Sequence, residues 1–193
     1  MVDPWNVTNY NRTDEELEEF LLFCIAVAGK TAKQISSALE NFIFCGKIEY
    51  GSSFSPFQII RQKYKDNTLL DAVKESKLGK HSLLTESFGI LAFANLNLKT
   101  CSIQELEAIP GIGPKTSRFF LVHSRKDANY AILDTHILRY MREKLSISTP
   151  KNTPTKKKYQ ELERRFLDFV KQHPSKKSIA ELDLKIWSLY ART

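Results

Sequence analysis

Hydrophobic residues recur along this chain at the three- and four-residue spacing of α-helices, and no segment of useful length alternates apolar and polar residues as a β-strand does. A first helix is expected after the capping box at Thr13 and should end at Gly29. A second should run from Thr31 to about Phe44, before a loop rich in Gly and Ser at residues 46–56. Further helices are expected over about 56–65, 68–76, 82–96, 102–106, from 114 onward, 134–144, 156–172 and 178–190. The pattern therefore predicts an all-α protein of about ten helices.

Two of the expected helices are short and are joined by a glycine-rich hairpin. The first opens with a capping box at Ser102 and should end at Pro110 and Gly111. Gly113 is expected to cap the second, and Pro114 to begin it, because a proline in the first helical position sacrifices no hydrogen bond. Such a turn points backbone N–H groups outward beside the positive end of a helix. This arrangement can bind a nucleic-acid phosphate without recognising base sequence.

Two chemically active side chains follow the hairpin. Lys115 would be the second residue of its helix, where the helix dipole and partial burial both disfavour the ammonium form and leave some nucleophilic amine. Asp134 precedes the apolar-periodic segment 137–141 and is expected at a helix N-cap. Each feature taken alone has an ordinary explanation, namely a turn, a solvated lysine and a structural cap.

Composition narrows the class of protein. A chain of 193 residues can form one compact domain or two small ones that share a cleft, and its net charge of +7 suggests a polyanionic partner. Three widely spaced cysteines without Cys-x-x-Cys spacing argue against a disulfide framework and against zinc, and the four histidines have no metal-ligand spacing. The longest apolar run, Phe20 to Ala28, is too short to span a bilayer. No signal peptide is visible, and an intracellular protein is expected.

The segments Ile109-Pro-Gly-Ile-Gly-Pro-Lys-Thr116 and Ala131-Ile-Leu-Asp-Thr-His136, taken together, resemble the helix-hairpin-helix DNA glycosylases. The resemblance implies that Lys115 is the lysine of the bifunctional glycosylase/lyases and that Asp134 is the catalytic carboxylate which the superfamily shares. It also implies two helical lobes with the active-site cleft between them. One would comprise residues of about 13–127 and end in the hairpin, and the other residues 128–193 with the N-terminal arm 1–12. The implied partner is double-stranded DNA that contains a damaged base or an abasic site, bound by a monomer.

Other stretches indicate the branch of this superfamily. No cysteine follows Cys101, so the four-cysteine iron–sulfur cluster of the endonuclease III type is not expected. No other cofactor is expected either. The stretches at residues 20–25, 131–139, 158–163 and 178–187 resemble the compact archaeal-type 8-oxoguanine DNA glycosylases. The hairpin departs from that family in carrying Pro110 and Pro114, which puts the identity of the excised base in question more than the chemistry.

The resemblance also implies a base pocket. In that family the tryptophan matching Trp187 stacks on the extruded base, and Phe88 is the candidate for a second stacking aromatic. Asp183, on the same helix face as Trp187, and the chain terminus beyond Arg192 are candidate acceptors for a hydrogen bond from the base. A structural role is the alternative, because Trp187 could be a core residue and Asp183 could pair with an adjacent basic residue.

Contacts to the DNA backbone are expected from Gly111 and Gly113 of the hairpin and from Lys30, at the turn where family members insert a residue into the duplex. An ordinary solvated lysine is the alternative for Lys30. The runs Lys156–Lys158 and Lys176–Lys177 could lie near phosphates or form solvated faces.

The expected activity is that of a bifunctional DNA glycosylase/AP lyase of base-excision repair. A damaged base, 8-oxoguanine as the first choice, would be flipped out and displaced by the Lys115 amine, and β-elimination from the resulting Schiff base would cut the strand. Two alternatives remain open. The substrate could be another damaged or mismatched base, such as a thymine or another pyrimidine, or the chain could be a non-catalytic hairpin module that only binds DNA.

Overall fold

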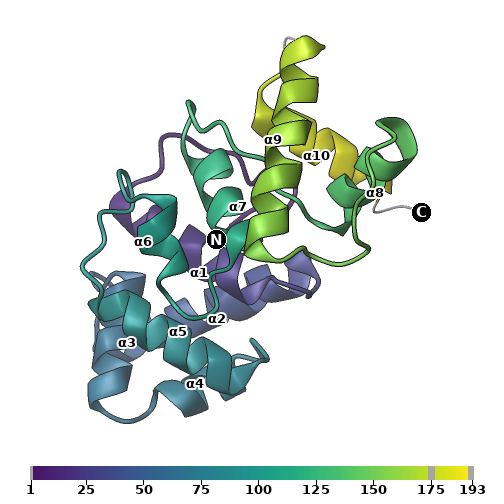
Figure 1. Cartoon of the computed structure of the whole chain (residues 1–193). Coiled ribbons are helices and arrows are strands. Elements are labelled where there is room, and N and C mark those ends of the chain that lie inside the picture. The colour runs from purple at the N-terminus through teal and green to yellow at the C-terminus, as the bar shows by residue number, and fades with distance from the viewer. Residues whose placement is uncertain (1, 174–176, 191–193) are drawn as a thin grey trace.

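The computed structural model describes residues 2–173 and 177–190, and every regular element within them is an α-helix (Figure 1). The all-α prediction is confirmed. The helices, in chain order, are α1 (Asp14–Ala26), α2 (Ala32–Tyr50), α3 (Pro56–Lys65), α4 (Leu69–Glu75), α5 (His81–Phe93), α6 (Ile103–Glu107), α7 (Pro114–Ser124), α8 (Thr135–Lys144), α9 (Lys156–Gln172) and α10 (Ile179–Tyr190). None of these helices is long and apolar enough to cross a membrane.

Helix starts fall where local capping signals place them. The hydroxyls of Thr13 and Ser102 each accept a hydrogen bond of 3.2 Å from the backbone N–H three residues later, and the glutamate there binds back to the cap residue. Gly113 is the N-cap of α7 with Pro114 in its first turn, and Asp134 is the N-cap of α8. These predictions are confirmed because a cap depends on residues within one turn of it.

Helix α2 differs from the sequence-based expectation, since it continues past Phe44 to Tyr50. Gly46 lies inside the helix and is buried there, because a Cβ atom at this position would collide with the side chain of Ile59 on α3. This glycine therefore allows two helices to approach closely and does not end one. Gly51 follows as the C-cap, and a residue with a side chain rarely adopts its φ of 121°.

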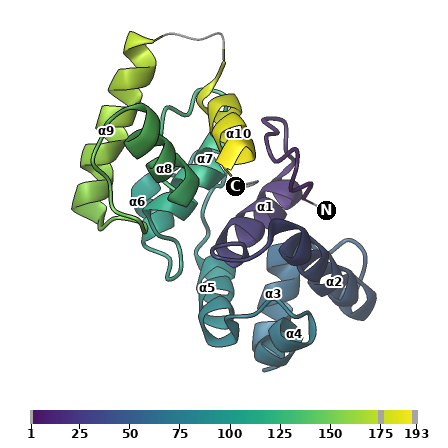
Figure 2. The same ribbon diagram turned by 90° about the vertical axis from the view of Figure 1, so that its right-hand side faces the viewer.

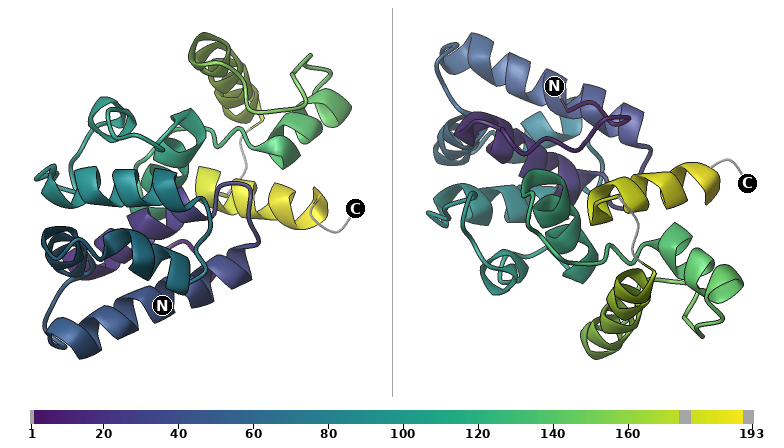
Figure 3. Two further views of the ribbon diagram at one scale, coloured as in Figure 1. Left: turned by 90° about the horizontal axis from the view of Figure 1, so that it is seen from below. Right: turned by 90° about the horizontal axis from the view of Figure 1, so that it is seen from above.

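The buried apolar residues form three clusters. The largest holds residues from positions 2–121 and includes α1 to α5 with the hairpin, and the second comes from α8, α9, α10 and the segments next to α8. A third, small cluster of Val122, Ile132 and Ala180 joins α7 to α10. Figure 2 shows α1 to α5 on one side and α8 to α10 on the other, with α6 and α7 beside the latter, and Figure 3 shows α10 between α8 and the N-terminal helices. Val2 and Val7, from the arm that we grouped with the second lobe, are buried in the largest cluster instead. The exact division into lobes stays a prediction.

All three cysteines are unpaired. Cys24 and Cys101 are buried, while Cys45 is exposed on α2. Burial raises the pKa of the Cys24 thiol, against the opposing charges of Lys115 and Arg12, and burial likewise raises the pKa of Cys101. Both buried thiols therefore stay protonated at neutral pH.

Candidate active site

A cavity of about 520 Å³ lies where the N-terminal arm, the α1–α2 turn, α7, the start of α8 and α10 meet. Five of the residues singled out from sequence line it, and a sixth, Trp5, joins them: Trp5, Lys30, Lys115, Asp134, Asp183 and Trp187. A cavity of about 630 Å³ along α9 contains none of these residues. The structure therefore gathers the predicted amine, carboxylates and tryptophan into one site.

Lys115 enters the cavity from the first turn of α7. Its half-buried side chain places Nζ over the ring of Phe119, one turn further along, at 4.9 Å from the ring centroid. A cation over an aromatic face is attracted by the ring quadrupole, so this contact directs the side chain. Among the residues that the structure describes, no carboxylate forms an ion pair with Lys115.

Asp134 faces Lys115 from the start of α8. One carboxylate oxygen, Oδ1, accepts a hydrogen bond of 2.8 Å from the Ile137 N–H, which completes the cap. Burial is the largest cause that raises the pKa of Asp134, and the negative charge of Asp183 raises it further, while the Ile137 N–H, Lys115 and His136 act in the opposite direction. The carboxyl group is thus a better proton acceptor than an exposed aspartate, and the positive charge of Lys115 lowers its pKa.

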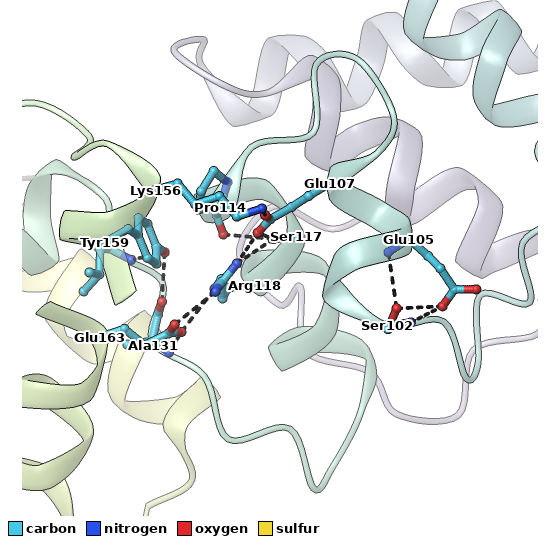
Figure 4. Close-up of polar contacts among 11 residues, drawn as sticks. Ser102, Glu105, Glu107, Pro114, Ser117, Arg118, Ala131, Lys156, Tyr159 and Glu163 are labelled. Carbon is cyan, nitrogen blue, oxygen red and sulfur yellow. Dashed lines mark hydrogen bonds and ion pairs between the residues drawn. The ribbon is translucent and has the colours of Figure 1, made fainter. Parts of the chain in front are cut away.

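The backbone that carries Asp134 is fixed by side chains of α9. The Tyr159 hydroxyl donates to the Ala131 carbonyl at 2.9 Å and accepts from the Leu133 N–H at 2.8 Å. Glu163 Oε1 accepts from the Ala131 N–H at 3.0 Å (Figure 4). An extended segment that would otherwise leave backbone groups unpaired is thereby bonded along its length, and Asp134 is held in one position.

A buried ion network connects this segment to the hairpin. Arg118 of α7 binds Glu163 through two parallel bonds of 3.2 and 3.1 Å and also pairs with Glu107 of α6. Lys156 approaches Glu107 at 2.7 Å. Figure 4 shows these side chains meeting between α6, α7 and α9. Because Lys115 is three residues from Arg118 on the same helix, the network fixes the helix that carries Lys115 relative to the segment that leads to Asp134. Sequence reasoning missed it, since nothing local relates charges 45 residues apart.

Asp183 is held by a second buried chain of polar groups. Its Oδ2 lies 3.2 Å from Nε2 of His123, a fully buried residue on α7, and Nδ1 of the same ring lies 2.8 Å from the Thr8 hydroxyl in the N-terminal arm. The partner of Asp183 is therefore a histidine and not an adjacent basic residue. Sequence reasoning assigned His123 no role, because its partners are 60 and 115 residues away along the chain.

Trp187 lies in the cavity wall, partly exposed, between two other rings. The centroid of Trp5 is 6.1 Å from that of Trp187, with the planes at 67°, and the centroid of His136 is 6.2 Å away on an edge-to-face contact of 83°. Trp187 is therefore a surface of the cavity and not a residue enclosed in the core.

Phe88, the expected second stacking aromatic, is not in the cavity. Its side chain is 0% exposed and packs edge-to-face on Phe42, at 6.1 Å between centroids, within the largest cluster. This prediction is wrong because Phe88 occupies the inward stripe of α5 with Leu84 and Leu91. No base could reach it.

The remaining predicted residues lie in the hairpin or at the rim. Gly111 is exposed with φ of 85°, and a Cβ there would lie 2.5 Å from the Ser87 hydroxyl, which binds the Pro110 carbonyl. Gly113 is exposed and extended at the start of α7. Lys30 is exposed at the cavity rim. The chain terminus beyond Arg192 and Lys176 lie outside the described residues.

Within the described parts of the chain, no group of three His, Cys, Asp or Glu side chains is arranged to hold a metal ion. The cavity offers three lysine side chains, Lys115 among them, together with two carboxylates and aromatic rings. An amine beside a carboxylate can attack an electrophilic carbon while the carboxylate accepts the displaced proton.

Three comparisons bear on this site. The family model described as 8-oxoguanine DNA glycosylase matches residues 2–174 of the chain. A curated relative from Fusobacterium nucleatum, an 8-oxoguanine DNA glycosylase/AP lyase, is 27% identical over 184 residues, which cover 92% of this chain and 81% of the relative.

Two solved structures from Methanocaldococcus jannaschii share the fold. One is an 8-oxoguanine glycosylase/lyase in complex with 15mer DNA containing 8-oxoguanine, with a TM-score of 0.63, 26% identity and coverage of 95% of this chain and 84% of that one. The other, an 8-oxoguanine DNA glycosylase, has a TM-score of 0.63 at 22% identity, with coverage of 97% and 84%.

Proposed function

The chain belongs to the 8-oxoguanine DNA glycosylase family, and we propose that it excises 8-oxoguanine from double-stranded DNA through a Schiff base on Lys115 and then cleaves the strand. The observation that carries the proposal is the meeting of Lys115 and Asp134 in one cavity, with Trp187 and Asp183 on its wall. The amine and the carboxylate act on the sugar, while the tryptophan and the second carboxylate receive the base.

The first step replaces the base with the lysine. Extrusion of a nucleotide from the duplex costs a few kcal/mol because stacking and pairing are lost, and this cost is lowest for a damaged or mispaired base. The lone pair of the Lys115 amine attacks C1′ of the sugar, and the bond from C1′ to the base breaks with its electron pair leaving on the base. Asp134 accepts a proton from the attacking nitrogen and stabilises positive charge that develops on the sugar, as carboxylates do in glycoside hydrolysis.

The second step cuts the strand. The bond between C1′ and the ring oxygen breaks with its electron pair on that oxygen, which takes up a proton, and the lone pair of the lysine nitrogen completes an iminium with C1′. Loss of a proton from C2′ then expels the phosphate on C3′, which breaks the strand on the 3′ side of the lesion. Hydrolysis of the imine returns the amine. We assign the taking and returning of protons in these steps to Asp134, because it lines the same cavity as Lys115.

The hairpin and the net charge of +7 support binding to the duplex. Gly111 and Gly113 are exposed residues that precede α7, and the dipole of this helix favours an anion at its start. A phosphate bound there would bring the neighbouring nucleotide towards Lys115, two residues further on. Lys30 at the rim would meet the backbone on the other side of the cavity.

The test combines a lesion panel with chemical trapping. Duplexes that each carry one modified base are incubated with the protein and scored for release of base and for strand cleavage. Borohydride, which reduces an iminium to a stable amine, should then join the protein to the 8-oxoguanine duplex. Lys115→Gln should abolish trapping and retain affinity for abasic-site DNA.

Lys33→Gln is the matched control, because Lys33 also lines the cavity and the change removes the same charge. Trapping should persist in this variant. Full trapping by Lys115→Gln would show that another amine is the nucleophile. Release of a pyrimidine with no release of 8-oxoguanine would keep the chemistry and overturn the proposed substrate.

A further inference from the structure

The N-terminal arm is bound to the protein on both sides of a short turn. Ser36 donates to the Val2 carbonyl at 2.5 Å, and Arg12 donates to the Val7 carbonyl at 2.6 Å. Both valines are buried in the largest cluster. Between them, the Asn6 N–H bonds to the Asp3 carbonyl at 3.2 Å and closes the turn. The backbone on either side of Trp5 is therefore fixed at the mouth of the cavity.

Trp5, at the tip of this turn, is 72% exposed, the largest exposed fraction among the large apolar side chains of the described residues. Tryptophan is usually well buried, so a tryptophan held out in solvent on an anchored backbone is informative. Its ring lines the cavity and touches Trp187 edge-to-face. A flat aromatic partner that enters this cavity would cover both rings.

The other aromatic rings of the cavity are already occupied. Phe23 is 1% exposed, and Phe119 is covered by the Lys115 ammonium. His136 meets Trp187 edge-on, with the planes at 83°. Trp5 is thus the ring that retains an accessible face close to Trp187.

Resting on the proposed function, we propose that Trp5 is the second aromatic wall of the base pocket and stacks on the face of the extruded base opposite Trp187. At 6.1 Å and 67° the two rings leave no space for a base to lie flat between them. Trp5 must therefore rotate about its side-chain bonds as the base enters, and its exposure allows this. The anchored backbone keeps the ring at the pocket, so the base is enclosed between two indoles.

This role separates Trp5 from the catalytic groups. Stacking recognises the base, whereas cleavage at a preformed abasic site involves only the sugar, Lys115 and Asp134. Trp5→Ala should lower single-turnover excision of 8-oxoguanine by about five-fold to about 150-fold, the range for loss of one base–aromatic stack. Cleavage at an abasic site should change by less than about two-fold, since no stack is involved.

Two variants control for folding and for exposed apolar surface. Trp5→Phe keeps a smaller ring and should recover most of the excision rate. Phe44→Ala removes an aromatic side chain that is 62% exposed on α2 and does not line the cavity, and it should excise at the wild-type rate. Wild-type excision by Trp5→Ala would overturn the inference, and so would an equal loss at the abasic site.

A binding measurement tests the contact directly, because Trp5 and Trp187 are the two tryptophans of the sequence. In the double variant Lys115→Gln/Trp187→Phe, Trp5 is the remaining tryptophan and no covalent step occurs. A duplex with 8-oxoguanine should quench its fluorescence more than a matched duplex with a tetrahydrofuran abasic analogue. Equal quenching by the two duplexes would show that Trp5 does not meet the base.

Failure of the proposed function gives a different result. A wild-type protein that releases no 8-oxoguanine in the lesion panel would refute the substrate. The fluorescence comparison requires binding but no excision. In that case it is run with the duplex whose modified base the panel shows to be released. If no base is released, the duplex that binds most tightly is used. A quenching of Trp5 that depends on the base would still support its place in the base pocket, and a quenching that is equal with and without the base would still overturn it.

Discussion

Replacement of Asp134 by asparagine should separate catalysis from stability at one residue. The amide oxygen of asparagine can accept the same hydrogen bond from the Ile137 N–H that Oδ1 accepts now at 2.8 Å, so the cap of α8 is retained. The negative charge and the ability to take a proton are lost. Excision should therefore slow by about 10²-fold or more, which corresponds to about 2.7 kcal/mol of activation free energy.

The folded protein should nevertheless be as stable as the wild type or more stable at neutral pH. Burial, and then the charge of Asp183, raises the pKa of Asp134 in the folded state above its unfolded value. A group of this kind contributes its full stability below the unfolded pKa and loses it as the pH rises through the folded pKa. Each pH unit between the two values corresponds to about 1.4 kcal/mol. Asparagine carries no charge and incurs no such loss.

Urea unfolding at two pH values measures this difference. The advantage of Asp134→Asn should be present at pH 7 and should disappear at a pH below about 4, near the unfolded pKa, where the wild-type carboxyl is also neutral. Asp134→Ala is the control, since it lacks the cap and should be about 0.5–2 kcal/mol less stable than the asparagine variant at both pH values. Wild-type excision by a folded asparagine variant would refute the catalytic role. A variant less stable than wild type at pH 7 would refute the electrostatic reasoning.

Four further results are expected. Trp187→Ala should reduce 8-oxoguanine excision about five-fold to about 150-fold in single-turnover assays and leave abasic-site cleavage nearly unchanged, whereas an equal fall in both would mark a structural residue. Asp183→Asn should move the acid limb of the kcat/KM pH profile to lower pH, because a charge that raises the pKa of Asp134 is gone; an unmoved limb would assign it to another group. Glu163→Gln should cost about 1.5–3 kcal/mol in urea unfolding, since the buried Arg118 keeps Glu107 but loses the charge of Glu163, and a neutral result would mean that this pair does not hold α7 against α9. Affinity for undamaged duplex should fall steeply with salt as counterions are released, and a flat salt dependence would exclude a DNA-facing positive surface.

Local signals made most of the fold predictable. Thr13, Ser102 and Gly113 begin helices because their side chains or backbone satisfy N–H groups within one turn, and this information is present in four consecutive residues. Gly46 misled the prediction of α2, since the reason for that glycine is the distant side chain of Ile59 and not a turn. A glycine that allows close packing and a glycine that ends a helix are the same letter in a sequence.

Site residues that belong to a family motif could be predicted from the sequence, and those outside the motifs could not. Lys115 and Asp134 could be paired from the motif, and the structure brings them to one cavity. Phe88 was misassigned because a helical stripe does not reveal which of its faces a cavity touches. His123 meets Asp183 across 60 residues of chain and Thr8 across 115, and Trp5 meets Trp187 from the other end of the described chain; no spacing rule encodes such contacts.

The distribution of thiols has a practical consequence for watching the protein on DNA. Alkylating dyes react with the thiolate, and burial keeps Cys24 and Cys101 both protonated and out of reach. Cys45 on α2 is exposed, and it does not line the cavity. A maleimide fluorophore should therefore attach to the unmodified sequence at one position, and single molecules could be followed along a stretched duplex without a mutation. The same thiol is the first that oxidants would reach, so a reductant is needed until the label is attached.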